Sequence, residues 1–323
     1  MRVFIAGATG VLGRRLVPML LSEGHEVVGT TRSKQKAMGL RQAGIEPVVL
    51  DGLNGAAVHS AVRAARPQVI VHELTALAGK TDIRTMEEGF EVTNRLRTDG
   101  TDILVSAARE AGVRRVVAQS FTGWPNERTG GPVKTEEDPL DRAPPAAMHA
   151  ALDAIEHLEH AVTHTRGLDG LVLRYGTFYG PGTTLSEGGD HVEQIRRRRF
   201  PVVGDGEGIW SFVHIDDAAS ATVAAIERGA PGIYNVVDDE PARVSDWLPA
   251  LADAIGAKPP RHIPVWLARL LTGEAGVTLM TSVRGSSNAK AKRELRWLPR
   301  YPSWRSGFRL GLGRADERLR GAA

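Results

Sequence analysis

The sequence contains no cysteine among its 323 residues. This absence excludes disulfide bonds, thiolate nucleophiles and zinc sites built from cysteine ligands. No stretch reaches the roughly 18 consecutive apolar residues that a membrane helix needs, and the first residues lack the apolar run and cleavage site of a secretory signal. We therefore expect a soluble cytoplasmic protein with no membrane partner.

The sequence also has little net charge. Its 41 lysines and arginines exceed its 38 acidic residues by only three. Such a balance does not favour an acidic partner, and no basic stripe interleaved with aromatic residues is present to bind nucleic acid. A Gly-x-Ser-x-Gly elbow is missing too, so nothing indicates a serine hydrolase. We expect a small-molecule substrate and no nucleic-acid partner.

Short apolar strands alternate with helical patterns through the first half of the chain. Strands are predicted at residues 3–6, 26–30, 46–50, 68–71, 115–119 and 170–174, and helices at residues 11–22, 98–111 and 146–165. This alternation predicts an α/β fold with a doubly wound, parallel Rossmann-type sheet.

The second half of the chain is less regular. It predicts short strands at residues 211–214 and 232–236 and helices near 244–255 and 264–271. We expect residues 1–175, joined by 210–237, to form a dinucleotide-binding domain. The smaller substrate-binding part then comprises residues 176–209 and 238–323.

Three glycines separate the first predicted strand from the first predicted helix, in the order Gly7-Ala-Thr-Gly10-Val-Leu-Gly13. The first glycine permits a tight turn, the second lets a pyrophosphate approach the backbone, and the third lets helix and strand pack closely. The free N–H groups of the helix N-terminus then face the phosphates. A turn without a ligand is the alternative, but the strand–turn–helix context favours a dinucleotide. The predicted contacts here are Gly7, Thr9, Gly10, Val11, Leu12 and Gly13.

The end of the second strand bears on the choice between NAD and NADP. An NAD site usually places an acid there to bind the ribose hydroxyls, but this chain reads Gly29-Thr-Thr-Arg32-Ser33-Lys34. Arg32 and Ser33 suit a 2′-phosphate, although a solvated basic turn would have the same composition. We predict NADP(H), with NAD as the second choice, and expect Asp51 and Gly52 near the adenosine.

Further segments occur in the order of a known superfamily. The glycine spacing and the segments 69–76, 107–120, 173–182 and 210–218 resemble those of extended short-chain dehydrogenases/reductases, in the epimerase/dehydratase-like branch. The resemblance implies a homodimer formed through the helices at 98–111 and 146–165. It also implies further cofactor contacts from Leu74, Thr75, Asn94, Gln119, Tyr175 and Thr177.

One departure from this superfamily concerns catalysis. Its members usually carry Tyr-x-x-x-Lys on the helix after residue 145, but the matching positions here are Met148 and Leu152. Losing a general acid typically costs a factor of about 10² to 10⁴ in rate, so a catalyst would need a substitute. The candidate substitutes are Ser120, Thr122, His149, Tyr175 and Tyr179.

Each candidate also has a structural explanation. Ser120 and Thr122 could cap a strand end, His149 titrates near neutrality but could face away from the pocket, and the two tyrosines could pack beneath the Gly-Pro-Gly turn.

Two further clusters have simpler explanations. His157, His160 and His164 share one helix face, but spacing alone does not orient three imidazoles toward one ion, so we predict no metal. The arginines at 196–199 are interpreted as an exposed helix end rather than a phosphate site.

These patterns lead to one main functional hypothesis. The chain is predicted to be an NADP(H)-dependent oxidoreductase that acts on a carbonyl, alcohol or activated alkene of a small organic or sugar-nucleotide-like molecule. A redox-neutral epimerase, isomerase or cyclase that retains its cofactor is one alternative. A non-catalytic NADP(H) sensor is the other.

Overall fold

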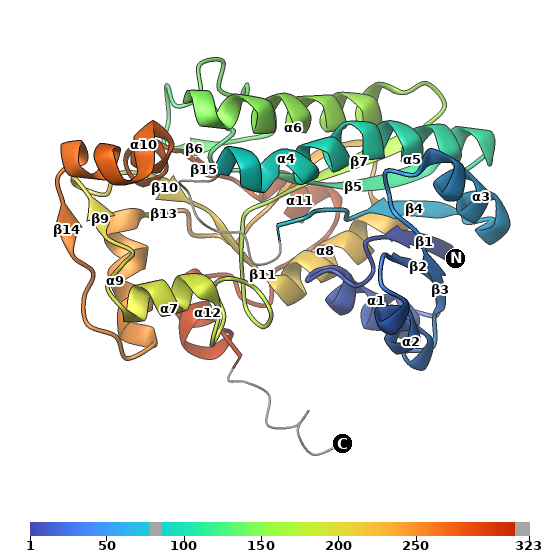
Figure 1. Cartoon of the computed structure of the whole chain (residues 1–323), viewed down its shortest axis with the longest axis horizontal. Coiled ribbons are helices and arrows are strands. Elements are labelled where there is room, and N and C mark those ends of the chain that lie inside the picture. The colour runs from blue at the N-terminus through green and yellow to red at the C-terminus, as the bar shows by residue number, and fades with distance from the viewer. Residues whose placement is uncertain (78–85, 314–323) are drawn as a thin grey trace.

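The computed structural model describes residues 1–77 and 86–313, which are built around one seven-stranded sheet (Figure 1). The strand order is β12-β7-β5-β4-β1-β2-β3, and every neighbouring pair is parallel. The strands are β1 (Arg2–Ala6), β2 (Glu26–Thr31), β3 (Glu46–Val49), β4 (Val69–His72), β5 (Arg115–Phe121), β7 (Asp169–Tyr175) and β12 (Gly232–Val236). The predicted doubly wound Rossmann-type sheet is confirmed.

Helices cover both faces of this sheet (Figure 1). One face carries α1 (Gly13–Ser22), α2 (Lys34–Gln42) and α8 (Ile215–Arg228), and the other carries α3 (Gly55–Ala65), α4 (Met86–Arg97), α5 (Asp99–Glu110) and α6 (Ala146–His164). Each face has its own apolar core, centred on residues such as Leu16 and Ala221 on the first face and Val62 and Leu158 on the second. Because both faces are covered, the strands are apolar throughout, as buried parallel strands usually are.

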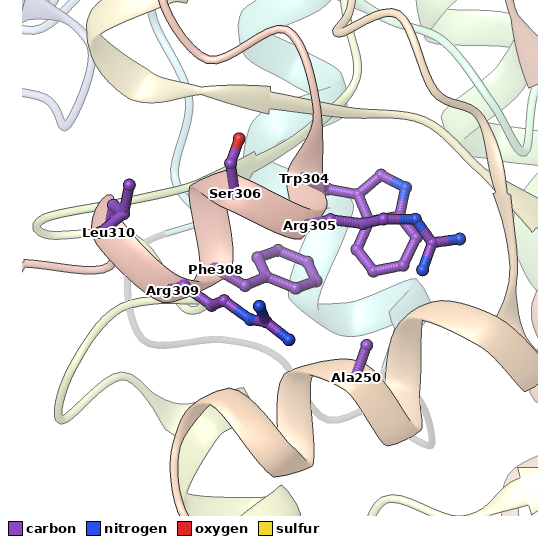
Figure 2. Close-up of a pocket in the computed structure, with 7 residues that line it drawn as sticks. All are labelled: Ala250, Trp304, Arg305, Ser306, Phe308, Arg309 and Leu310. Atoms are coloured by element: carbon purple, nitrogen blue, oxygen red, sulfur yellow. The ribbon is translucent and has the colours of Figure 1, made fainter.

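The C-terminal part forms a second, aromatic core. It contains α7 (Asp190–Arg196), α9 (Val244–Ala254), α10 (Val265–Thr281) and α12 (Trp304–Leu310), with α11 (Ala289–Glu294) returning to β12. Phe212, Trp247, Trp304 and Phe308 are fully buried and meet edge-on or tilted. Between α9 and α12 lies a hollow of about 420 Å³, whose wall includes Ala250, Trp304 and Phe308 (Figure 2).

Short strand pairs tie the two parts of the chain together. They are β8 (Thr177–Tyr179) with β11 (Phe212–His214), β6 (Val133–Lys134) with β15 (Gly285–Ser286), β9 (Val202–Val203) with β14 (His262–Ile263), and β10 (Ile209–Trp210) with β13 (Ala242–Arg243). The long segment 122–145 is therefore held against residues 285–286. The sheet does include β12, but the division into two domains stays a prediction.

Some element boundaries differ from those predicted. Helix α1 begins at Gly13 rather than residue 11, because Gly10 N–H bonds back to the Gly7 carbonyl and the loop continues to Leu12. Helix α10 runs to Thr281 rather than 271, with a kink at Gly273, whose φ is 68°. The helix α4 was not predicted at all. Among the described residues, no helix is both long and apolar enough to cross a bilayer.

Candidate functional site

A cavity of about 620 Å³ lies at the carboxyl ends of the parallel strands. Its wall is formed by residues that follow β1, β4, β5 and β7, which are neighbours in the sheet. Residues of α7 and of the C-terminal part close the other side, including His191, Trp210 and Leu279. This is the edge where open α/β sheets bind their ligands.

The glycine loop forms one end of the cavity. Gly7 has φ +102°, and a Cβ atom there would lie 2.7 Å from the Glu73 carbonyl oxygen. A Cβ atom on Gly13 would lie 2.6 Å from the carbonyl oxygens of Gly7 and Ala8. Helix α1 has no side-chain N-cap, and the N–H groups of Arg14 and Arg15 bond back to the carbonyls of Gly10 and Leu12. Among the described residues, the N–H groups left for a phosphate at this helix start are those of Val11, Leu12 and Gly13. The loop therefore fits the pyrophosphate of a dinucleotide.

The predicted cofactor residues divide into two groups by position. Those that line the cavity are Gly10, Val11, Leu12, Gly13, Thr75, Gln119, Tyr175 and Thr177. Those that lie outside it are Gly7, Thr9, Arg32, Ser33, Asp51, Gly52, Leu74 and Asn94. The structure thus separates a cavity-lining group from an outer group, in which Arg32 and Ser33 follow β2, Asp51 and Gly52 follow β3, and Asn94 lies on α4.

Contacts within the outer group are local. Thr9 Oγ1 lies 3.2 Å from Thr31 Oγ1, and Ser33 Oγ caps α2 by accepting a bond from Lys36 N–H. Asp51 Oδ1 accepts a bond from Leu53 N–H. The Arg32 side chain is exposed beside them. These residues stay predicted cofactor contacts.

The five candidate acids are not brought together. Thr122 and Tyr175 line the cavity, whereas Ser120, His149 and Tyr179 do not. Ser120 Oγ donates to Glu159 of α6 at 2.7 Å, and exposed His149 bonds to the Pro144 carbonyl oxygen through Nε2 at 2.7 Å. Ser120 and His149 thus lie outside the cavity lining and are engaged by neighbours, and their role in proton transfer stays a prediction.

The two tyrosines are poor acids in this structure. Tyr175 O–H meets Thr222 Oγ1 of α8 at 2.6 Å, and burial followed by the nearby Glu73 raises its pKa. Tyr179 is fully buried beneath Phe308 and His214, and burial raises its pKa as well. Tyr179 thus packs in the C-terminal core and does not line the cavity, and its role as an acid stays a prediction.

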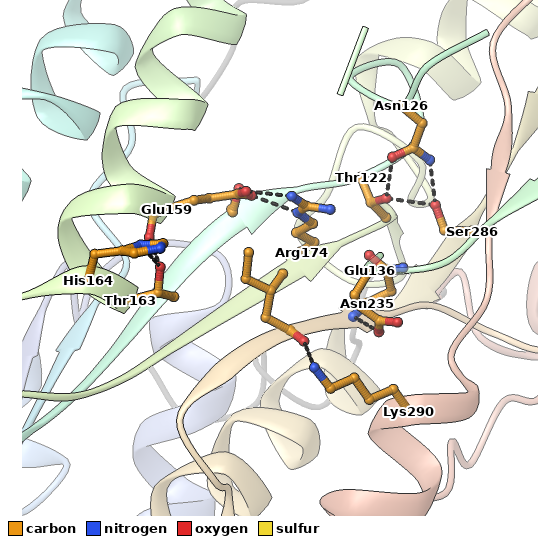
Figure 3. Close-up of polar contacts among 12 residues, drawn as sticks. Thr122, Asn126, Glu136, Glu159, Thr163, His164, Arg174, Asn235, Ser286 and Lys290 are labelled. Atoms are coloured by element: carbon orange, nitrogen blue, oxygen red, sulfur yellow. Dashed lines mark hydrogen bonds and ion pairs between the residues drawn. The ribbon is translucent and has the colours of Figure 1, made fainter. Parts of the chain in front are cut away.

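Thr122 is held in a small polar network (Figure 3). Its Oγ1 lies 2.6 Å from Ser286 Oγ and 3.3 Å from Asn126 Oδ1. The Asn126 amide also donates to Ser286 Oγ at 2.9 Å. The hydroxyl is therefore fixed by its neighbours, and no acidic or basic group in this network would ionise it.

Comparison with known proteins resolves the family. Residues 3–236 match the NAD dependent epimerase/dehydratase family. The chain belongs to this family. It is therefore an NAD(P)-dependent enzyme of the oxidoreductase/epimerase type, as predicted, and its cofactor is a nicotinamide dinucleotide.

Individual relatives support the assignment. The chain is 45% identical over 311 residues to a 3-diazoavenalumate denitrifying reductase of a Streptomyces species, covering 95% of this chain and 99% of that protein. It is 27% identical to a 4-hydroxy-2-methyl-3-oxo-4-farnesyl-3,4-dihydroquinoline-1-oxide ketoreductase of Stigmatella aurantiaca, over 91% of this chain and 85% of that protein.

A solved structure has the same fold. The Thermus thermophilus UDP-glucose 4-epimerase in complex with NAD superposes with a TM-score of 0.72, at 26% identity and with 100% of both chains covered.

Met148 and Leu152, the two positions predicted to match the superfamily's tyrosine and lysine, lie on α6. Helix α6 reads AAMHAALDAIEHLEHAVTH and contains neither tyrosine nor lysine. Met148 and Leu152 are buried in a cluster with Trp124, Ile155 and Val283 and do not line the cavity. No proton donor can act from these two positions.

The structure reveals cavity residues that sequence reasoning missed. Glu73 follows β4, Arg97 ends α4, and His191 lies on α7. Each has a fully enclosed polar atom without a hydrogen-bond partner: both carboxylate oxygens of Glu73, Nη1 of Arg97 and Nδ1 of His191. Burial raises the pKa of Glu73 and lowers the pKa of His191 to about 4. Unpartnered polar groups of this kind mark ligand sites.

The histidines on one face of α6 bond and stack with neighbouring side chains. His157 pairs with Asp102 of α5 at 2.8 Å, and His160 stacks on His164. Within the residues that the structure describes, no group of three or more metal-binding side chains is present. In the arginine run, Arg196 pairs with Glu187 and Glu193, as expected for an exposed helix end.

Proposed function

We propose that this protein is an NADPH-dependent reductase that replaces the diazo group of a small organic acid with hydrogen and releases N₂. The observation that carries this proposal is the buried apolar pair Met148 and Leu152 on α6, at the positions that we match to the family's tyrosine and lysine. The relative at 45% identity, a denitrifying reductase of a diazo acid, supports the substrate class.

The loss of N₂ from the substrate explains why the reaction would not need the family's tyrosine and lysine. When bound, the reduced nicotinamide supplies a hydride. A ketone that accepts hydride also needs a proton on its oxygen, which the family's tyrosine would supply. The diazo group in its diazonium form, R–N₂⁺, accepts hydride to become R–H and releases neutral N₂. Charge and atoms therefore balance without a proton from the protein.

The cavity of this chain suits that reaction. Its wall carries Phe90, Phe121, Trp124, Phe178, Phe200 and Trp210. Apolar and aromatic walls keep water from the reactive substrate and favour flat ligands. The fixed Thr122 hydroxyl at the end of β5 can orient a polar substituent.

The direct test is a reaction of the purified protein with NADPH and 3-diazoavenalumate. We expect one N₂ released for each NADPH oxidised, measured by gas analysis and by loss of absorbance. Gly13→Val is the matched control, because a side chain there would collide with two carbonyl oxygens. NADPH oxidation by simple ketones, with none by the diazo acid, would contradict the proposal.

The preference for NADPH is supported by the end of β2. Arg32 is exposed and is followed by Ser33 and Lys34, and this turn contains no acidic residue. Arg32→Ala is expected to weaken NADPH binding roughly tenfold and leave NADH binding unchanged, because a charged hydrogen bond to the 2′-phosphate is lost. Fluorescence titration with both cofactors measures this, with exposed Arg41→Ala as the control. If NADPH binding and NADH binding were weakened equally, Arg32 would not contact the 2′-phosphate.

A further inference from the structure

Arg97 is a buried cation on the cavity wall. It is the last residue of α4 and is only 6% exposed. Its Nη1 is fully enclosed and has no hydrogen-bond partner. Among the described residues, no carboxylate lies within ion-pair distance of its guanidinium, although Arg95 on the same helix pairs with Asp99. A buried guanidinium without a counter-ion is costly unless a ligand provides one.

The nearest acid is already committed elsewhere. Glu159 on α6 influences Arg97 electrostatically, but its two oxygens bind Arg174 through Nε at 2.7 Å and Nη2 at 2.5 Å (Figure 3). Glu159 also accepts a hydrogen bond from Ser120. Glu159 therefore pairs with Arg174, and Arg97 forms no ion pair with a carboxylate of the described residues.

Two other described acids, Glu73 and exposed Asp190, line the cavity wall, and neither forms an ion pair with Arg97. Burial raises the pKa of Glu73, which favours its neutral form. Burial lowers the pKa of Arg97 only to about 10, with Glu159 opposing the shift, so Arg97 stays cationic at neutral pH. The cavity wall therefore presents a positive charge to whatever binds beside α4.

An aromatic surface adjoins this charge. Phe90 precedes Arg97 by seven residues on α4, so both side chains share one helix face, roughly 10 Å apart along the axis. Phe121 and Trp124 lie after β5 and also line the cavity. An elongated aromatic ligand can thus lie along Phe90 and Trp124 with an anionic group near Arg97.

We propose that Arg97 binds the carboxylate of an aromatic acid substrate through its guanidinium, while the ring of that acid packs against Phe90 and Trp124. This inference rests on the proposed function, since it names the residue that holds the acid end of the diazo substrate. A guanidinium can form two parallel, charge-assisted hydrogen bonds with a carboxylate. Neutralising the charge of Arg97 would make binding selective for acids.

The test compares ligands that differ only in charge, with no turnover involved. Cinnamate and cinnamamide are titrated into the NADPH-loaded protein by calorimetry. We expect wild type to bind the acid at least tenfold more tightly than the amide. Arg97→Met should weaken cinnamate binding roughly 10- to 100-fold and leave cinnamamide binding unchanged. Arg97→Lys should retain part of the preference, because the charge remains and the paired hydrogen bonds are lost.

Controls separate this inference from the proposed function. Arg95→Met changes an exposed arginine on the same helix and should leave both ligands unaffected. A wild-type protein that binds acid and amide equally overturns the carboxylate site, even if it reduces the diazo acid. A preference for acids that Arg97→Met abolishes upholds the site, even if no diazo acid is reduced. If Arg97→Met and Arg97→Lys weaken NADPH binding but leave cinnamate binding unchanged, Arg97 binds the cofactor and the inference is wrong.

Discussion

Replacing Glu159 with glutamine is expected to destabilise the protein by about 3–5 kcal/mol, the usual cost of breaking a buried ion pair from one side. Glu159 and Arg174 have side chains only 6% and 5% exposed. Glutamine keeps the shape of the side chain and can still accept a bond from Ser120. It leaves Arg174 and Arg97 buried without any negative charge, because Glu159 is the acid that influences both.

The loss should be visible as a fall in Tm of roughly 10 °C. Thermal unfolding without cofactor measures it. Glu187→Gln is the matched control, since it breaks a surface pair with Arg196 in which the side chains are 36% and 33% exposed. That change should cost about 1 kcal/mol or less. Similar Tm values for the two variants would show that the buried pair contributes little.

A compensated double variant tests the physical reason. Glu159→Leu combined with Arg174→Met removes both partners and leaves a buried apolar pair. Such replacements are often neutral or stabilising relative to the ion pair. The double variant should therefore recover much of the stability lost in Glu159→Gln. A double variant that is less stable than Glu159→Gln would show that Glu159 stabilises the protein mainly through Ser120 and Arg97 and less through its ion pair with Arg174.

The sequence was sufficient for the fold because its signals are local. Alternating strands and helices predicted the parallel sheet, and Gly7, Gly10 and Gly13 marked the turn that begins α1. These features depend on residues close together in the chain, so periodicity and spacing reveal them. The same segments indicated the family, which the match over residues 3–236 confirms, whereas the replacement of its tyrosine–lysine pair stays a prediction.

The cavity wall could not be predicted to the same extent. Asn94 is predicted to contact the cofactor, but it does not line the cavity, whereas Phe90 and Arg97 of the same helix do. Helix α4 was not predicted, so its inner face was unknown. The aromatic wall is assembled from residues on separate segments, such as Phe90, Trp124 and Trp210, and only tertiary packing brings them together.

One missed residue did leave a signal in the sequence. Glu73 lies in the apolar run Val69-Ile-Val-His-Glu-Leu-Thr-Ala, directly after β4. An acid in such a run, at the edge where ligands bind, is unusual for a buried strand. The candidate acids were instead sought on β5, α6 and β7, where the family resemblance directed attention.

Glu73 should make the stability of the protein fall as the pH rises. Its side chain is buried, both carboxylate oxygens lack hydrogen-bond partners, and burial raises its pKa well above 4.5. The folded protein therefore retains a proton that the unfolded chain releases above pH 4.5. The contribution of protonated Glu73 to the free energy of unfolding is fully present below that pH. It is lost progressively as the pH rises to the raised pKa of the folded state.

Glu73→Gln removes this proton linkage while preserving the size of the side chain. Within the affected range, each unit of pH increase lowers the free energy of unfolding of the wild type by up to about 1.4 kcal/mol relative to the variant. We expect the variant to have a Tm higher by several degrees at pH 8, and the difference to shrink toward pH 4.5. Thermal unfolding of the cofactor-free protein across this range measures the effect.

Two neighbours can modify the result. Tyr175 of β7 lies close enough to Glu73 for the carboxylate to raise the pKa of the tyrosine. Arg97 of α4 lines the same cavity, and its positive charge would reduce the free-energy cost of ionising Glu73. Exposed Glu23→Gln is the control and should show no pH-dependent difference from wild type. Parallel Tm curves for wild type and Glu73→Gln would mean that Glu73 ionises freely in the folded protein. The cavity would then contain a carboxylate at neutral pH, and Arg97 would have a partner of opposite charge on the same wall.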